Sequence, residues 1–207
     1  MKVPRAIDER PIFANVSHKC TLWNERVTLL LSLQNGRQIM ADKQDAIALL
    51  KADHRAVEEL FEKFETAKAD GAKQKIALEI CLQLTVHAKI EEEIFYPACE
   101  GKIDEDLLKE AYVEHDGAKV LIAEIEAGAP SDEFYDAKVT VLSEQIEHHV
   151  GEEEQRLEGM FAQARKAGLD MDELGDRLRA RKAELLVEFK SGGLPKPELA
   201  TFTDATV

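Results

Sequence analysis

Hydrophobic residues between positions 42 and 167 recur at alternating steps of three and four, the spacing that places side chains on one face of an α-helix. Four such stretches follow one another, separated by breaks that contain glycine or proline. The pattern predicts helices over roughly residues 42–69, 72–97, 104–127 and 131–167. A weaker and highly charged stretch over residues 171–190 predicts a fifth helix.

Short breaks between long amphipathic stretches predict an all-α fold, namely an up-down-up-down antiparallel four-helix bundle with an additional C-terminal helix. We expect the bundle to occupy residues 41–168 and an accessory helix to occupy residues 169–191, outside the bundle. Residues 192–207 contain Pro195 and Pro197 and are expected to form a loose C-terminal tail.

Residues 1–40 do not share the helical period, because prolines, asparagines and Gly36 interrupt it. We interpret them as an irregular N-terminal extension. Met40 is followed by Ala-Asp-Lys-Gln-Asp, which is typical of a helix start with acids in its first turn. Two interpretations therefore stay open: translation begins at Met40 and residues 1–39 belong to a mis-called start, or the extension is a genuine tail.

Each of the four predicted bundle helices carries a histidine on its apolar face. Two of them add a glutamate four residues later, on the same face of the helix. Burying such polar groups without a partner costs about 2–7 kcal/mol each, and more for a charge. A metal ion would satisfy them, and the candidate ligands are His54, His87, Glu91, His115, His149 and Glu153.

An internal repeat strengthens the interpretation of a metal site. His54 precedes His87 by 33 residues and His115 precedes His149 by 34, and in each pair the second histidine is followed by a glutamate at the fourth position. The apolar residues that follow His54 and His115 also fall at identical offsets. Two copies of one helix pair indicate a pseudo-two-fold site with two similar metal ions.

Two ligand assignments have competitors. His148 and Glu152 have the same spacing as His149 and Glu153, but the latter pair is aligned with the apolar residues of its helix. Glu58 lies four residues after His54, at the edge of the apolar face, and an edge position is the simpler interpretation. Imidazole and carboxylate ligands together suit iron, manganese or zinc.

The amino-acid composition limits which binding partners and which cellular compartment we expect for this chain. The net charge of −14 and the pI of about 4.9 are unfavourable for binding nucleic acid or an anionic membrane surface. Three cysteines without C-x-x-C spacing indicate reduced thiols in a cytoplasmic protein. No apolar run reaches the roughly 20 residues that span a bilayer.

Four segments carry a family resemblance: Ala52-Asp53-His54; His87 to Pro97, with the sequence HAKIEEEIFYP; Glu114-His115-Asp116; and His148 to Glu154, with the sequence HHVGEEE. Over roughly residues 44–165 the chain resembles the hemerythrin-like, or HHE cation-binding, family. The resemblance implies a four-helix bundle with a non-haem di-iron centre that meets dioxygen or related small ligands. It also implies that the six candidate residues are the iron ligands, with Glu91 and Glu153 as bridges.

Two departures from oxygen-carrying hemerythrins bear on function. Those proteins have a second histidine four residues after the third-helix histidine, where this chain has Lys119, and an aspartate where this chain has Glu153. A centre with one imidazole fewer is expected to be more open and more easily oxidised, which favours sensing, scavenging or redox work over oxygen storage.

The leading functional hypothesis is therefore a binding protein whose di-iron centre binds or senses dioxygen, nitric oxide, peroxide or iron. The alternative is a di-iron oxidase or peroxidase-like enzyme, although no residue is assigned a catalytic role. A third hypothesis is an interaction module whose histidines are structural. The sequence indicates no particular protein partner.

Overall fold

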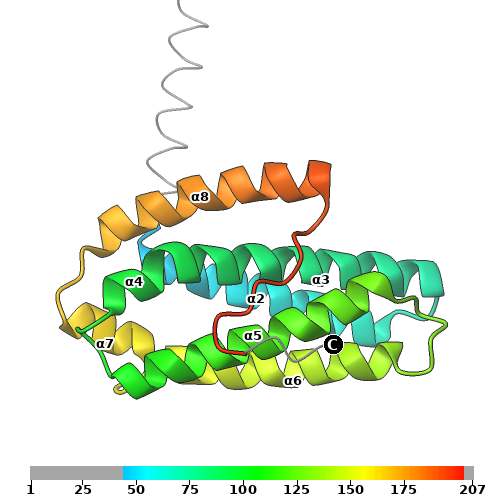
Figure 1. Cartoon of the computed structure of the whole chain (residues 1–207), viewed down its shortest axis with the longest axis horizontal. Helices are drawn as coiled ribbons and strands as arrows, with labels where there is room; N and C mark the ends of the chain where they lie inside the picture. The colour runs from blue at the N-terminus through cyan, green and yellow to red at the C-terminus, as the bar shows by residue number, and fades with distance from the viewer. Residues whose placement is uncertain (1–43, 203–207) are drawn as a thin grey trace, which may run out of the picture. The chain divides into compact units, whose positions relative to one another are not determined.

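The computed structural model describes residues 44–202, so the predicted N-terminal extension lies outside the described residues. Within that range all regular secondary structure is helical, which confirms the predicted all-α fold class (Figure 1). No helix in the described range is long and apolar enough to cross a membrane. The proposed division into a bundle, an accessory helix and a tail stays a prediction.

Four long helices carry the fold, and aspartates cap two of them. Asp45 accepts a hydrogen bond from the backbone N–H of Ala48, and Asp104 accepts one from Asp106, so exposed N–H groups at these helix starts have partners. The four are α2 (Ala46–Thr66), α3 (Asp70–Ile90), α5 (Glu105–Ala127) and α6 (Tyr135–Glu154). The shorter or outer elements are η1 (Glu91–Phe95), α4 (Tyr96–Cys99), α7 (Met160–Lys166) and α8 (Met171–Gly192).

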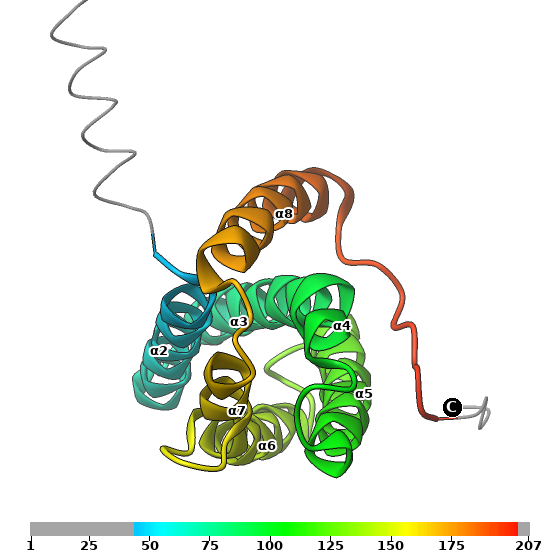
Figure 2. The ribbon, with the colours of Figure 1, turned by 90° about the vertical axis from the view of Figure 1, so that its left-hand side faces the viewer.

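The four long helices surround a common interior (Figure 2). Helix α2 packs against α3 and α6, and α5 packs against α3 and α6. Helix α8 lies outside this ring, across α2 and α3. Two hydrophobic clusters fill the interior, one that includes Phe95 and Phe161 and one that includes Phe61 and Leu142. Along α2, His54 lies between Leu50 of the first cluster and Val57 of the second, so the histidines occupy the level between the clusters.

The fourth predicted helix does not run unbroken to Gly168. Helix α6 ends at Glu154, and α7 begins at Met160 after a turn. A Cβ on Gly159 would lie 2.6 Å from the backbone nitrogen and oxygen of Gln155, so this turn needs a glycine. The break leaves Leu157 82% exposed, although the apolar period of the sequence would place it on the interior face of a continuous helix. It also lets α7 bring Phe161 over His54, with stacked rings 5.9 Å apart.

The segment after α8 crosses α3 and reaches α5 (Figure 1). We call residues 193–202, the described part of the predicted tail, the strap. Asp116 on α5 has no exposed surface and accepts hydrogen bonds from the backbone N–H groups of Ala200 and Thr201 and from the Thr201 hydroxyl. These bonds hold the end of the strap against α5.

Candidate metal centre

The bundle brings all six predicted ligand residues into one interior site. They come from every long helix and from η1, and each is at most 6% exposed. Their helices supply them in the order α2, α3, η1, α5 and α6: His54; His87; Glu91; His115; and His149 with Glu153.

The imidazoles form two close pairs. The Nε2 atoms of His54 and His87 lie 3.0 Å apart, and those of His115 and His149 lie 3.2 Å apart. The first pair forms a potential metal cluster with Glu91 and Glu153, and the second forms one with Glu91; within each cluster the donor atoms lie within 4.8 Å of one another. The two pairs correspond to the two copies of the sequence repeat.

Each glutamate contacts one histidine of each pair. Glu91 Oε2 lies 3.2 Å from Nε2 of His87 and 3.5 Å from Nε2 of His115. Glu153 Oε2 lies 3.3 Å from Nε2 of His54, and its Oε1 lies 3.7 Å from Nε2 of His149. Both carboxylates therefore lie between the pairs, where a bridging ligand would be placed.

A second set of carboxylates faces the outer nitrogen, Nδ1, of each of the four interior histidines. The distances are 2.8 Å from Glu154 to His54, 2.9 Å from Glu92 to His115, 2.7 Å from Glu114 to His149 and 3.6 Å from Asp53 to His87. We call Asp53, Glu92, Glu114 and Glu154 the outer carboxylates. Carboxylates in this position fix the tautomer and ring orientation of metal-binding histidines.

The outer carboxylates follow the same pseudo-two-fold as the ligands. The acid before the first histidine of each repeat faces the second histidine of that repeat, as Asp53 faces His87. The acid after each inner glutamate faces the first histidine of the other repeat, as Glu92 faces His115. Neither Glu92 nor Glu154 is among the predicted ligands, and the signal that the sequence offers is that every outer carboxylate is adjacent to one of them.

Three of these contacts are hydrogen bonds that orient the imidazoles of His54, His115 and His149, whereas Nδ1 of His87 is buried without a hydrogen-bond partner. A neutral histidine carries one proton, and a carboxylate at Nδ1 holds that proton on the outer nitrogen. When the imidazoles are neutral, their Nε2 lone pairs converge on the centre, where a cation among them would stabilise the arrangement. Both oxygens of Glu91 and Oε2 of Glu153 are also buried without a hydrogen-bond partner. The donor set therefore fits metal ions.

The pKa values of the two inner glutamates are shifted in opposite directions. Burial raises the pKa of Glu91 well above its usual value, and the nearby charge of Glu153 raises it further. Burial also disfavours the charged form of Glu153, but His149 and His54 outweigh it and hold the pKa of Glu153 at about 2. Burial lowers the pKa of His87 to about 4. A neutral His87 imidazole is the form that binds a metal.

A π-helical turn places one more polar group at the centre. In η1 the backbone N–H of Tyr96 bonds to the carbonyl of Glu91, five residues earlier, and Pro97 has no N–H with which to continue a regular helix. The Tyr96 hydroxyl lies 3.1 Å from Nε2 of His115, 3.5 Å from Nε2 of His149 and 3.2 Å from Glu153 Oε1, to which it donates. Tyr96 is not among the residues that the sequence predicts for the site.

The competing candidates lie away from the interior. The His148 side chain is 66% exposed and, with Glu110 and Glu152, belongs to a separate surface cluster. The Glu58 side chain is 60% exposed and pairs with Arg55 at 3.3 Å. Lys119 donates to Glu92 and to Asp116 and therefore supports the outer layer of the centre.

Known proteins share sequence with this chain. The family model described as Hemerythrin HHE cation binding domain matches residues 45–161. A curated protein from Nostoc sp., described as a DNA nickase, is 31% identical over 119 residues, which make up 56% of this chain. Those residues cover 34% of the Nostoc protein, so the chain spans about a third of that relative.

A solved structure provides a likeness of fold alone. It is the crystal structure of a hemerythrin HHE cation binding domain-containing protein from Mycobacterium kansasii, which superposes with a TM-score of 0.62 at 21% sequence identity. The similarity covers 73% of this chain and 95% of the Mycobacterium chain.

Proposed function

Because the chain belongs to the hemerythrin HHE cation-binding domain family, we propose that it holds a non-haem di-iron centre that binds or senses a small ligand. The proposed ligands are dioxygen, nitric oxide, peroxide or iron itself. Metal binding rests on the family and on the His/Glu clusters, whereas the identity of the metal and of the ligand is our proposal.

The observation that carries the proposal is the convergence of four inner imidazole nitrogens on two buried glutamates. His54 and His87 would hold one iron, and His115 and His149 the other, with Glu91 and Glu153 facing both. Iron bound there would supply one-electron redox chemistry and open positions for a small molecule. The chain's own residues orient the imidazoles through the outer carboxylates and shield the centre with Phe95 and Phe161.

The donor set supports binding of an external ligand over a saturated structural site. Four imidazoles and two carboxylates, shared between two metals, leave positions of six-coordinate ions unfilled. Lys119, at the place of a further family histidine, is engaged with Glu92 and Asp116 and adds no nitrogen ligand. Water or an exogenous molecule would complete the coordination.

Metal analysis tests this proposal. The purified chain, reconstituted with ferrous iron under anaerobic conditions, is expected to hold about two irons per chain and to develop near-ultraviolet absorption on exposure to air. His87→Ala should lose iron, whereas Glu58→Ala, a variant of an exposed residue, should keep it. A wild-type chain that retains only trace iron after reconstitution would overturn the proposal.

A second candidate function is a di-iron oxidase or peroxidase-like activity, and the Tyr96 hydroxyl favours it. This hydroxyl is buried and within hydrogen-bond distance of His115 and Glu153, so it would be placed to exchange a proton with a small molecule bound beside His115. Turnover separates the two functions. An enzyme consumes many equivalents of hydrogen peroxide per chain and slows in Tyr96→Phe, whereas a carrier or sensor reacts about once.

We propose no nucleic-acid or membrane partner for this chain. The name of the Nostoc relative concerns DNA, but the chain covers only a third of that protein, and its net charge of −14 opposes binding to phosphate backbones. A reducing cytoplasmic setting is also part of the proposal, and the free thiols Cys81 and Cys99 support it.

A further inference from the structure

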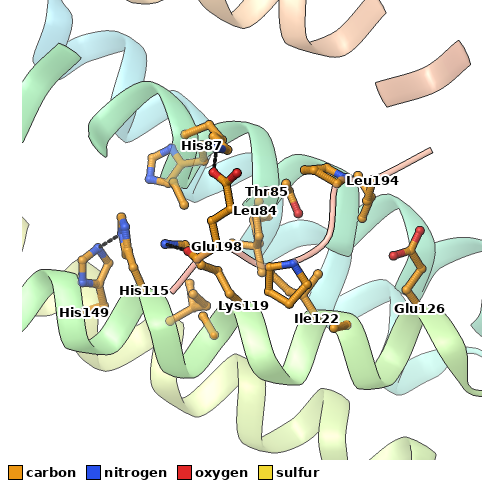
Figure 3. Close-up of a pocket in the computed structure, with 18 of the residues that line it drawn as sticks. Leu84, Thr85, His87, His115, Lys119, Ile122, Glu126, His149, Leu194 and Glu198 are labelled. Atoms are coloured by element: carbon orange, nitrogen blue, oxygen red, sulfur yellow. Dashed lines mark hydrogen bonds and ion pairs between the residues drawn. The ribbon is translucent and has the colours of Figure 1, made fainter. Parts of the chain in front are cut away.

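A cavity of about 480 Å³ opens beside the four imidazoles. His54, His87, His115 and His149 line it, so the space meets the candidate metal centre directly. Figure 3 shows the histidines at one end and Glu126 at the other, with Leu84 and Ile122 between them. Tyr96 and Phe161 are not among the lining residues, so the cavity approaches the centre from the side of the second hydrophobic cluster.

The cavity is elongated along α5. Its lining on this helix begins at His115 and continues through Ile122 and Ala123 to Ala127. Twelve helical steps of about 1.5 Å each correspond to a length of about 18 Å. A molecule that fills this space is therefore long and narrow.

The walls of the cavity are mainly apolar. Aliphatic side chains come from four helices, and alanines on α3 and α5 leave the space between them open. The apolar lining residues of these helices are Val57, Leu84, Ala88, Ala118, Ile122, Ala123, Ala127, Ile146 and Val150.

The strap forms the outer wall. It contributes Leu194, Pro195 and Pro197 to the lining. Glu198 binds it to both neighbouring helices, because its carboxylate pairs with Lys89 at 3.1 Å and its backbone carbonyl accepts from Lys119 at 3.1 Å (Figure 3). The strap thus covers the space with three apolar side chains, and Lys196 and Glu198 also line it.

The volume exceeds what a diatomic ligand needs. One water takes up about 30 Å³, whereas sites for small organic molecules span about 300–1,000 Å³. Dioxygen, nitric oxide or peroxide would occupy only the end of the cavity next to the histidines. A long apolar space with a metal centre at one end is the shape of a site for an organic ligand.

We propose that this cavity binds an elongated, mainly apolar organic molecule whose oxygen-bearing end meets the metal centre. The apolar body lies along α5 between Ile122 and the strap, and the polar end faces the Nε2 atoms of the histidines. The position of the polar end rests on the proposed di-iron function. The binding of the apolar body rests on the cavity itself.

A series of straight-chain carboxylates tests the proposal. Acetate, hexanoate and decanoate are titrated by isothermal calorimetry into the iron-loaded chain and into the metal-free chain. Each methylene that enters the cavity is expected to raise the affinity about fourfold. An affinity that does not rise from acetate to decanoate would overturn the proposal, because the cavity would then contribute nothing beyond the metal.

A variant that fills the cavity away from the metal adds a second measurement. Ala123→Phe is expected to weaken decanoate binding at least tenfold while iron content and acetate binding stay unchanged. Val113→Phe is the matched control, because Val113 lies on the same helix, is 45% exposed and does not line the cavity. Equal decanoate affinity in both variants would place the ligand elsewhere and contradict the proposal.

Failure of the proposed function gives a different result. If the chain holds no iron but the metal-free form still shows the chain-length series and its loss in Ala123→Phe, the di-iron function fails and the apolar site stands. If iron is held but decanoate binds no better than acetate, the di-iron function stands and the apolar site fails.

Discussion

The outer carboxylates lead to a sharp prediction at Glu114. Its Oε2 lies 2.7 Å from Nδ1 of His149, and its side chain is 18% exposed. Glu114→Gln keeps the shape and an oxygen that accepts the Nδ1 proton, but it removes the charge. Glu114→Ala removes the hydrogen bond as well. The two variants therefore separate the charge from the orientation of the imidazole.

The expected magnitude follows from the type of hydrogen bond. A bond to a charged group contributes about 1.5–3 kcal/mol and a neutral one about 0.5–1.5 kcal/mol. Glu114→Gln should therefore weaken metal binding at His115 and His149 by about 1–1.5 kcal/mol, which is about tenfold. Glu114→Ala should approach the upper end of the effect of such outer partners, about 100-fold. The metal held by His54 and His87 should be affected much less.

Competition with a chelator measures this effect. In each Glu114 variant, about half of the bound iron should leave at a lower chelator concentration, and the other half should leave as in the wild type. Urea unfolding gives a second readout, because tenfold weaker metal binding lowers the difference in stability between the iron-loaded and the metal-free chain by about 1.4 kcal/mol.

Two controls isolate the contact with His149. Glu110→Gln changes an exposed acid one turn earlier on α5. His148→Gln removes the other histidine near Glu114, since Nε2 of His148 lies 3.5 Å from Oε1 of Glu114. Both should bind iron as the wild type does. If Glu114→Ala also retains wild-type affinity, or if both irons weaken equally, the assignment of Glu114 to a single imidazole is wrong.

Two further predictions concern other parts of the described chain. Burial raises the pKa of Cys81 and Cys99 to about 12, so neither thiol ionises at pH 8. A Cys20→Ser chain should therefore resist alkylation by iodoacetamide when it is folded and react at both thiols in urea. Rapid labelling of the folded chain would contradict this prediction. Thr201→Val removes the 2.8 Å hydrogen bond from the hydroxyl to Asp116. The backbone amide at position 201 should then exchange with solvent about tenfold faster, while exchange in α6 stays unchanged. Unchanged exchange at Thr201 would show that this bond does not hold the strap.

The fold class could be predicted because each helix has a local pattern of apolar residues in the sequence. The three-and-four spacing of apolar residues and the breaks between them predict α2 and α5 within a few residues, and the stretch predicted over 72–97 spans α3, η1 and the start of α4. The break after Glu154 could not be predicted in this way, because the apolar period continues to Met160. It depends on the backbone at Gln155 approaching Gly159 too closely for any side chain, a contact that exists only in the folded chain.

By itself, the sequence determined that four helices each carry a histidine inward and that two of them add a glutamate, because helical spacing alone fixes which residues share a face. Only the tertiary structure decided which residues meet across helices. It pairs each imidazole with an outer carboxylate, brings the Tyr96 hydroxyl to the centre through a π-turn and lays the strap over an apolar cavity. Such contacts join residues far apart in the chain, as His54 and Glu154 are, and no local pattern records which of many exposed acids will be a partner.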